Sequence, residues 1–549
     1  MTTFPFPPPP TSPPTPTPPS DALFPLDRAL RGIRDRFADA VIDADRTSLR
    51  ERTVVVPAAR LAEVAHAVAT EWGGTFVTLF GLDECATDGR YRLHTSFSMA
   101  PEDALLTLIA AVPASAPRYP AVSARLHAAT WCERELRDTL GVVAEGHPDL
   151  RPLVLHEGWP AGAHPLRKDF RVPDGLDWAP RFTVPRVAGE GVFEIPVGPI
   201  HAGIIEPGHF RIATVGESLL SLDVKLGWTF RGLEKLAEGQ TFQRGLELAE
   251  RLCGSCAFSH GLAFSKAAEE IAGIPAPARA RAVRTIAAEL ERITNHLGDL
   301  AGITNDCAYV VGAAEFMRWK EVLHQLADAL FGHRWLRGVC VPGGVRVDLD
   351  EPQQQWLRSV LSEVRTGVGL TSRAVLANDA VVDRLAATGV LSATVARDLG
   401  ATGPSARASG LTFDVRRDHP YAFYKELDFQ VVRREAGDVQ ARFELKAAEI
   451  LESMNLIDQL VNRMPGGPLV QHMGEMPPGR WGLALVESPR GLLSHWLRPG
   501  PDGRIADWRV RSASHALWPA VAHCVPGNIV PDFPLINRSF NLCYACCDK

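Results

Sequence analysis

The sequence predicts an α+β protein, in which a small α/β domain precedes a large, mainly helical-bundle domain with small peripheral β-sheets. Two observations support this. Between residues 21 and 170, short β-branched runs alternate with amphipathic stretches, whereas after Pro277 apolar residues recur at helical spacing. The chain also has 549 residues, which is long for a single hydrophobic core. We therefore expect two domains.

Changes in composition set the expected boundaries. Residues 1–20 are rich in proline, which predicts a disordered tail of polyproline-II character. Residues 21–170 form the predicted α/β domain. Residues 171–190 contain several prolines and glycines and predict a linker. Residues 191–549 form the second domain.

The elements of the first domain follow from short local patterns. The run Thr-Val-Val-Val-Pro predicts a strand, and an amphipathic stretch after it predicts a helix. Two further β-branched and aromatic runs lie on either side of a turn at Asp88-Gly89. The expected strands cover residues 53–57, 75–79 and 91–97, and the expected helices cover residues 58–72 and 133–141.

The second domain begins with two short predicted strands and then becomes helical. From Val283 to Leu300, apolar residues recur at alternating spacings of three and four, which predicts one long amphipathic helix with an apolar seam. Chain breakers return after Pro465. Further helices are expected at 313–331, 353–377, 379–386, 392–399 and 439–463, and strands at 193–198, 210–215, 481–487 and 505–511.

Bulk properties exclude several classes of protein. Apolar residues make up 46% of the chain and charged residues 22%, which are ordinary globular values. The net charge of −6 gives no reason to expect nucleic acid as a partner. No run approaches the roughly 18 apolar residues of a membrane span, and no secretory signal is visible. We therefore expect no direct membrane span and a cytoplasmic location.

The residues that carry chemistry are two Cys-x-x-Cys pairs, Cys253/Cys256 and Cys543/Cys546, separated by about half of the chain. Two residues between thiols allow both sulfurs of a pair to reach one metal. Four thiolates form a soft site that suits zinc, an iron–sulfur cluster or nickel. Ten cysteines in so long a chain do not form a disulfide framework, and five of them cluster at 253/256 and 543/546/547. This favours a metal in a reducing compartment.

The sequence around these pairs resembles a known family. Arg-x-Cys-Gly-x-Cys-x-x-x-His over residues 251–260, with the final Cys-x-x-Cys over residues 543–546, is similar to the large, catalytic subunit of nickel–iron hydrogenases. Within that family the chain resembles the complex I-related, energy-converting group typified by formate hydrogenlyase. The resemblance implies that residues 21–170 are a docking domain like the 30-kDa subunit of complex I. It implies that residues 191–549 are a hydrogenase large-subunit domain like the 49-kDa subunit.

The resemblance also implies the cofactor and its ligands. Cys253 and Cys543 would be terminal ligands of nickel, whereas Cys256 and Cys546 would bridge nickel to an iron that carries carbon monoxide and cyanide. A structural zinc site, or four unrelated core thiols, would explain the same residues without that chemistry. We expect no iron–sulfur cluster within this chain, because beyond these four cysteines it has no second cluster motif.

Five further residues receive roles by resemblance. Glu206 matches the glutamate that begins proton relay, and Arg490 matches the arginine poised over the metal pair. Asp306 falls where the family places a carboxylate that pairs with that arginine. His209 and His260 are expected to orient the site by hydrogen bonds rather than to bind metal.

Three features depart from the family pattern. Asn541-Leu542 stand where the family usually has Asp-Pro, which removes a charge partner of Arg490. Cys547 adds a thiol directly after the final motif. The sequence ends at Lys549, where the family commonly loses an extension after metal insertion, so we expect either a mature form or a variant without this processing.

The expected function is reversible interconversion of dihydrogen with protons and electrons. The implied partners are an iron–sulfur small subunit of complex I type, a ferredoxin-like subunit and membrane subunits, with formate dehydrogenase as a further candidate. The chain would sit peripherally on the inner face of the cell membrane. Two alternatives remain: a metal-free, complex I-like quinone-binding subunit, in which His201 would contact the quinone, and a structural connector whose cysteines hold zinc.

Overall fold

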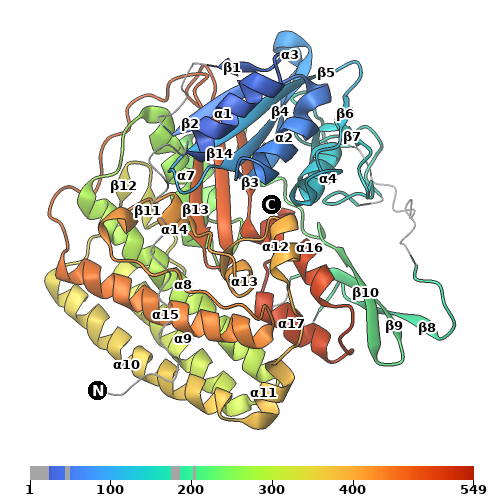
Figure 1. Cartoon of the computed structure of the whole chain (residues 1–549). Coiled ribbons are helices and arrows are strands. Elements are labelled where there is room, and N and C mark those ends of the chain that lie inside the picture. The colour runs from blue at the N-terminus through green and yellow to red at the C-terminus, as the bar shows by residue number, and fades with distance from the viewer. Residues whose placement is uncertain (1–23, 44–49, 157, 174, 176–185, 202–205) are drawn as a thin grey trace.

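The fold is seen in a computed structural model, and the class predicted from the sequence is confirmed (Figure 1). A small α/β module formed by the N-terminal part of the chain packs on a larger module that contains a bundle of long helices. The predicted tail, residues 1–20, and much of the predicted linker lie outside the described residues. The structure describes residues 24–43, 50–156, 158–173, 175, 186–201 and 206–549.

The N-terminal module is built on a mixed sheet of order β1-β2-β5-β4-β3, in which only β2 and β5 pair in parallel. The sequence analysis missed two of its main elements, α1 and β5. The β5 run Leu-Leu-Thr-Leu-Ile-Ala-Ala-Val-Pro is almost continuously apolar because the strand is buried on both faces, so it shows no alternation. The elements are α1 (Pro25–Arg36), β1 (Val41–Asp43), β2 (Glu51–Val55), α2 (Leu61–Thr70), β3 (Thr75–Glu84), α3 (Cys85–Asp88), β4 (Arg90–Ser98), β5 (Leu105–Pro113), β6 (Arg118–Pro120), α4 (Thr130–Leu140) and β7 (Val143–Glu145).

Long helices form the bundle of the second module, as predicted. The apolar seam expected between Val283 and Leu300 lies on α8, and these two side chains are fully buried. α8 packs against α9 and α15, and α10 packs against α9 and α15 (Figure 1). The helices are α7 (Ala257–Ala272), α8 (Ala278–Asp306), α9 (Val310–Phe331), α10 (Glu351–Leu376), α11 (Asp379–Leu385), α12 (Ala393–Asp398), α13 (Gly403–Arg407), α14 (Val415–Asp418) and α15 (Val439–Asn462).

A second sheet, β13-β14-β15, lies between the two modules. Its outer strands match the predicted runs at 481–487 and 505–511. The sequence analysis missed the central strand β14 and placed the sheet at the periphery. In the structure every residue of β13 is buried, because α7 and α14 pack against this strand, while β3 of the N-terminal module approaches its neighbours β14 and β15. The strands are β13 (Gly482–Ser488), β14 (Gly491–Pro499) and β15 (Ile505–Arg511).

The remaining elements surround the site. A three-stranded antiparallel sheet, β8-β9-β10, projects from the body of the molecule (Figure 1). Two short helices lead to the first cysteine pair, and three helices follow β15. Across the described part of the chain, no helix combines the length and the apolarity that a membrane crossing needs. These elements are β8 (Val192–Val197), β9 (His209–Val215), β10 (Ser218–Lys225), α5 (Leu233–Leu236), α6 (Phe242–Ala249), β11 (Cys340–Val341), β12 (Gly344–Val345), α16 (Ala513–Cys524), α17 (Asp532–Phe540) and α18 (Ala545–Asp548).

Candidate metal centre

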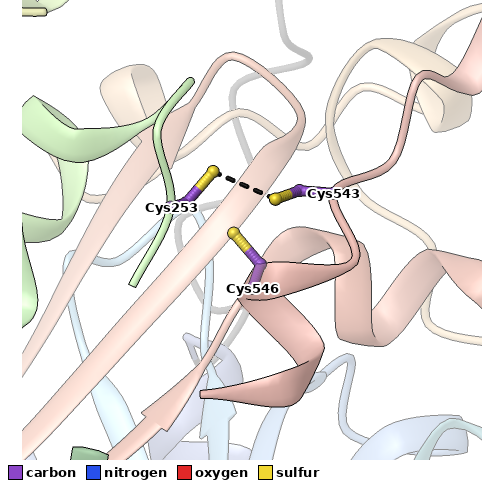
Figure 2. Close-up of side chains that lie close together, drawn as sticks. All are labelled: Cys253, Cys543 and Cys546. Atoms are coloured by element: carbon purple, nitrogen blue, oxygen red, sulfur yellow. Dashed lines mark hydrogen bonds between the residues drawn. The ribbon is translucent and has the colours of Figure 1, made fainter. Parts of the chain in front are cut away.

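The two Cys-x-x-Cys pairs meet, although about half of the chain separates them. Cys253 lies in the turn before α7, and Cys256 is the residue that precedes the first turn of that helix. Cys543 follows α17, and Cys546 lies on α18 (Figure 2). Asn541 ends α17 in the left-handed conformation, with φ 48° and ψ 50°, and so turns the chain toward the first pair.

The four sulfurs face one another in two close pairs. Cys253 Sγ lies 3.1 Å from Cys543 Sγ, and Cys256 Sγ lies 3.5 Å from Cys546 Sγ. These separations are longer than the roughly 2.05 Å of a disulfide bond, and all four thiols are free. Cys253, Cys256 and Cys546 are buried, whereas Cys543 is partly exposed. The soft, convergent donor set fits a thiophilic transition-metal site.

The thiols also share their protons unequally. The pKa of Cys253 is held well below the ordinary thiol value by hydrogen bonds from Cys256, Cys543 and Cys546. The pKa values of those three thiols are raised, with the thiolate of Cys253 as a main cause for each. One thiolate is therefore already favoured, and a metal ion would release the remaining protons on binding.

His260, for which the sequence analysis expected an orienting role, lies directly against this cluster. Its Nε2 is 3.6 Å from Cys546 Sγ, and its Nδ1 is 3.0 Å from Nε2 of His495. His209 does not have the expected position. Its Nδ1 lies 3.2 Å from the carbonyl oxygen of Gly198, because the residue begins β9 and its ring is used to hold the neighbouring strand connection.

Glu206 reaches the cluster from the β8–β9 connection. Its Oε2 accepts a hydrogen bond of 2.7 Å from the backbone N–H of Ala545 and lies 3.7 Å from Cys543 Sγ. Burial raises the pKa of this carboxyl, and the nearby charge of Cys253 acts in the same direction. A carboxyl in this position can exchange a proton with the sulfur.

Arg490 lies at the tip between β13 and β14 and reaches over the cysteines. Its Nε donates to the backbone oxygen of Asn541, and its Nη1 donates to Oδ1 of Asn295 at 3.1 Å. The expected pair with Asp306 does not form: Asp306 lies near Arg538, 4.0 Å from its Nε. The reason is helical geometry, since Asp306 ends α8 almost two turns beyond Asp299.

Asp299 supplies the balancing charge instead. It accepts hydrogen bonds from the amide of Asn541 and, at 2.6 Å, from Lys446 Nζ. Although burial opposes charge on both groups, Lys446 holds the pKa of Asp299 well below its ordinary value, and Asp299 raises that of Arg490. The sequence analysis missed Asn295, Asp299 and Lys446. A signal existed in the polar residues 295 and 299, which lie one turn apart on α8 beside its apolar seam.

One cavity adjoins the cluster, and a second cavity lies next to the first. One, of ≈ 560 Å³, is lined by Glu206, Cys253, Cys543, Arg490, Lys320 and Asp306. The other, of ≈ 310 Å³, is lined by His201, Phe210, Asp306, Asn541 and Tyr544 among others. Asp306 and Asn541 border both cavities. The first brings the thiols, a carboxyl and a guanidinium to one space, which is the arrangement that acid–base chemistry at a metal needs.

Fold and site together define the class. Four convergent cysteines lie beside α8 of the helical bundle, and an α/β module packs against the sheet that carries Arg490. Three family descriptions match parts of the chain: "Respiratory-chain NADH dehydrogenase, 30 Kd subunit" matches residues 54–175, "Nickel-dependent hydrogenase" matches residues 231–298, and "Respiratory-chain NADH dehydrogenase, 49 Kd subunit" matches residues 306–481. The protein is thus a complex I-related oxidoreductase subunit with a hydrogenase-type site.

The similarity of this chain to individual known proteins identifies its family within this class. Formate hydrogenlyase subunit 5 of Escherichia coli is 34% identical over 95% of this chain and 93% of its own length. Hydrogenase-4 component G of the same organism is 32% identical over 95% of this chain and 92% of its own length. A chain of the membrane-bound sulfane sulfur reductase, an archaeal respiratory membrane complex, superposes with a TM-score of 0.62 at 26% identity, covering 66% of this chain and all of that one. The chain belongs to the family of complex I-related nickel–iron hydrogenase large subunits.

Proposed function

We propose that this chain is the catalytic subunit of a nickel–iron hydrogenase that interconverts dihydrogen with two protons and two electrons. The observation that carries the proposal is the convergence of Cys253, Cys256, Cys543 and Cys546 beneath Arg490 and beside Glu206. Isolated core thiols would not gather a buried guanidinium and a carboxyl with a raised pKa around them.

The four cysteines would hold the metal pair. Cys253 and Cys543 would be terminal nickel ligands, and Cys256 and Cys546 would bridge to an iron that carries carbon monoxide and cyanide. When bound, this group supplies a Lewis-acidic centre that polarises dihydrogen and takes up its electron pair. The facing of Cys253 with Cys543, and of Cys256 with Cys546, supports this division of the ligands.

The residues around the thiols have separate tasks. The sulfur of Cys543 would accept the proton that is released when dihydrogen is cleaved, and Glu206, 3.7 Å away, would take that proton from the sulfur. The backbone N–H of Ala545 keeps the carboxyl in place. Arg490 is held over the cavity by Asn295 and by the backbone of Asn541, and its permanent charge offers donors to anionic ligands of the metal pair.

Electrons must leave through a partner, because the sequence has no further cluster motif. We infer an iron–sulfur small subunit of complex I type, with a ferredoxin-like subunit and membrane subunits beyond it and formate dehydrogenase as a further candidate. The exposed side chains of Val310, Val311 and Met317 on α9 support a docking face there, since Met317 also lines the larger cavity. The chain would be peripheral on the inner face of the membrane.

The test is nickel and iron analysis combined with infrared spectroscopy of the complex purified from its native host. Equimolar nickel and iron with carbon monoxide and cyanide stretching bands are expected. Intact protein without nickel and without these bands would overturn the proposal.

One observation favours a second candidate, a metal-free quinone-binding subunit. His201, Asp306 and Tyr544 line the ≈ 310 Å³ cavity, whose other walls include apolar side chains such as Phe210. The same purified complex separates the two functions. Stoichiometric bound quinone in the absence of nickel would support this second candidate, and nickel with the infrared bands would reject it.

A further inference from the structure

A row of hydrogen bonds runs from β15 to the sulfur of Cys546. The indole Nε1–H of Trp508 donates to Nδ1 of His495 at 3.2 Å. Nε2 of His495 lies 3.0 Å from Nδ1 of His260, and Nε2 of His260 lies 3.6 Å from Cys546 Sγ. Trp508, His495 and His260 are completely buried, and Cys546 is 1% exposed.

Strand register explains why these side chains meet. His495 on β14 pairs with Val510 on β15, so Trp508 is its diagonal neighbour on the same face of the sheet. α7, which carries His260, packs on that face. Trp496 points to the opposite face, where its ring packs against Phe80 of the N-terminal module.

The indole N–H of Trp508 determines which ring nitrogen carries the proton in His495 and in His260. An indole N–H can donate but not accept, so Nδ1 of His495 must be the acceptor and carries no proton. The single ring proton of His495 therefore lies on Nε2 and is donated to Nδ1 of His260. The proton of His260 then lies on its own Nε2 and points at Cys546 Sγ.

We propose that Trp508 and His495 are positioning residues that set the tautomer of His260, so that its Nε2–H donates to the sulfur of Cys546. A donor on a thiolate withdraws electron density from the sulfur and hence from the metal to which it is bound. The tautomer assignment stands on hydrogen-bond geometry between two neutral imidazoles, because burial lowers the pKa of both His260 and His495. Its effect on the metal rests on the proposed function, in which Cys546 is a bridging ligand.

Two sets of variants isolate the effect. Trp508→Phe removes the indole donor that locks His495. Trp496→Phe is the matched control, because Trp496 is a buried indole in the adjacent strand whose Nε1 has no hydrogen-bond partner among the described residues. His495→Gln keeps the direction of the row, since its amide oxygen accepts from Trp508 while its amide nitrogen donates to His260. His495→Leu breaks the row, because leucine neither accepts a hydrogen bond from Trp508 nor donates one to His260.

The first experiment uses the metal-free full chain labelled with nitrogen-15 in histidine. Nuclear magnetic resonance of the ring nitrogens distinguishes a protonated from an unprotonated position. We expect His260 and His495 to carry the proton on Nε2 in the wild type and in Trp496→Phe, and a mixture of tautomers for His495 and His260 in Trp508→Phe. A wild-type His260 protonated on Nδ1 would overturn the assignment, as would an unchanged pattern in Trp508→Phe.

The second experiment reads the metal in the loaded complex. If the donor is lost, iron becomes more electron-rich, so the carbon monoxide band of Trp508→Phe and His495→Leu should shift to lower wavenumber. The bands of Trp496→Phe and His495→Gln should match the wild type. Identical bands in His495→Leu and the wild type would overturn the inference.

The outcomes also separate this inference from the proposed function. A wild-type complex without carbon monoxide and cyanide bands would contradict the hydrogenase assignment and leave the tautomer result intact. If Trp508→Phe does not fold, the comparison of His495→Gln with His495→Leu decides the same question, because both retain Trp508.

Discussion

Single residues around the cysteines show how the site balances charge. Arg490, Asp299 and Lys446 are buried, and Asn541 joins them: its backbone oxygen accepts from Arg490, and its amide donates to Asp299. The family's usual aspartate at this position would place a carboxylate against that of Asp299. The asparagine therefore fits a site whose negative charge has been supplied from α8.

Asn541→Asp tests this arrangement. Two carboxylates in contact oppose each other's ionisation, so we expect a loss of about 2 kcal/mol from the lost hydrogen bond and the unpaired buried charge. Asn541→Gly is the control, because glycine tolerates the left-handed backbone and removes only the amide. Thermal unfolding at pH 7 should rank Asn541→Asp below Asn541→Gly, with the gap closing in acid as one carboxyl takes a proton. Equal stability at pH 7 would refute this explanation.

Glu206 is the residue whose replacement should separate proton transfer from metal binding. Glu206→Gln keeps the size and removes the titrating group, so we expect normal nickel content with hydrogen–deuterium exchange slowed by about 10²–10⁴-fold. The exposed Glu217, in the same sheet region, supplies the control Glu217→Gln, which should exchange at the wild-type rate. Full exchange activity in Glu206→Gln would assign the proton route to another group.

Among the elements, α18 shows how a very short helix is held in place. The ammonium of Lys549 contacts Glu135 of α4 and Glu234 of α5, and the carboxylate of Asp548 accepts from the backbone N–H groups of Gly227 and Thr229 at 2.8 Å each. Since α18 carries Cys546, these contacts position one of the four clustered thiols from both modules.

The pH dependence of this anchor can be derived from Glu135. Burial alone would raise its pKa, but the charge of Lys549 and a hydrogen bond from His515 lower it to about 2, from an ordinary value near 4.5. A lowered pKa means that the stabilisation is complete above about pH 4.5 and is lost as pH falls toward 2. This pH-dependent stabilisation should be absent from Glu135→Gln, which has no titrating carboxyl at this position.

We therefore expect the difference in melting temperature between the wild type and Glu135→Gln to be largest near pH 6 and to shrink steadily below pH 4.5. Glu71→Gln is the matched control, because Glu71 forms an ion pair with Arg36 at the surface, where both side chains are nearly half exposed. That variant should differ little from the wild type at any pH. A constant difference for Glu135→Gln across the range would contradict the assignment.

At the scale of the whole molecule, the two modules share one interior. Phe80 of β3 packs with His94 against Trp496 of β14, with ring centroids 5.2 Å apart for both Phe80 pairs. Arg511 Nη1 donates to the backbone oxygen of Val77 at 2.6 Å. The sheet that carries Arg490 and His495 thus depends on the N-terminal module for one of its faces.

Phe80→Ala should expose this dependence. Truncation of a buried phenylalanine costs about 3–5 kcal/mol, and here the cavity opens between the modules. We expect a lower melting temperature and faster proteolysis in β13–β15 as well as in the N-terminal module. Phe24→Ala, at a phenylalanine that is 56% exposed, should change stability by about 0.5 kcal/mol or less. Proteolysis confined to the N-terminal module would show that the two interiors are independent.

The sequence by itself determined the features that depend on neighbours in the chain. The apolar seam of α8, the long helices and the strands β2, β3 and β4 of the N-terminal sheet follow from local patterns, and the Cys-x-x-Cys spacing marked all four thiols. Only the tertiary structure decided which polar residues serve them. Asn295 and Asp299 lie on α8, whereas Lys446, His495 and Trp508 come from α15, β14 and β15, and no local pattern joins these elements.

The physical reason is that a hydrogen bond depends on position in space, whereas periodicity records only which face of an element is buried. β14 was missed for a related cause: it is buried on both faces, so its sequence lacks the alternation that marks a half-exposed strand. Asp306 illustrates the same limit. Its place in the sequence suggested a partner for Arg490, but the pitch of α8 brings Asp299 to that charge and leaves Asp306 beside Arg538.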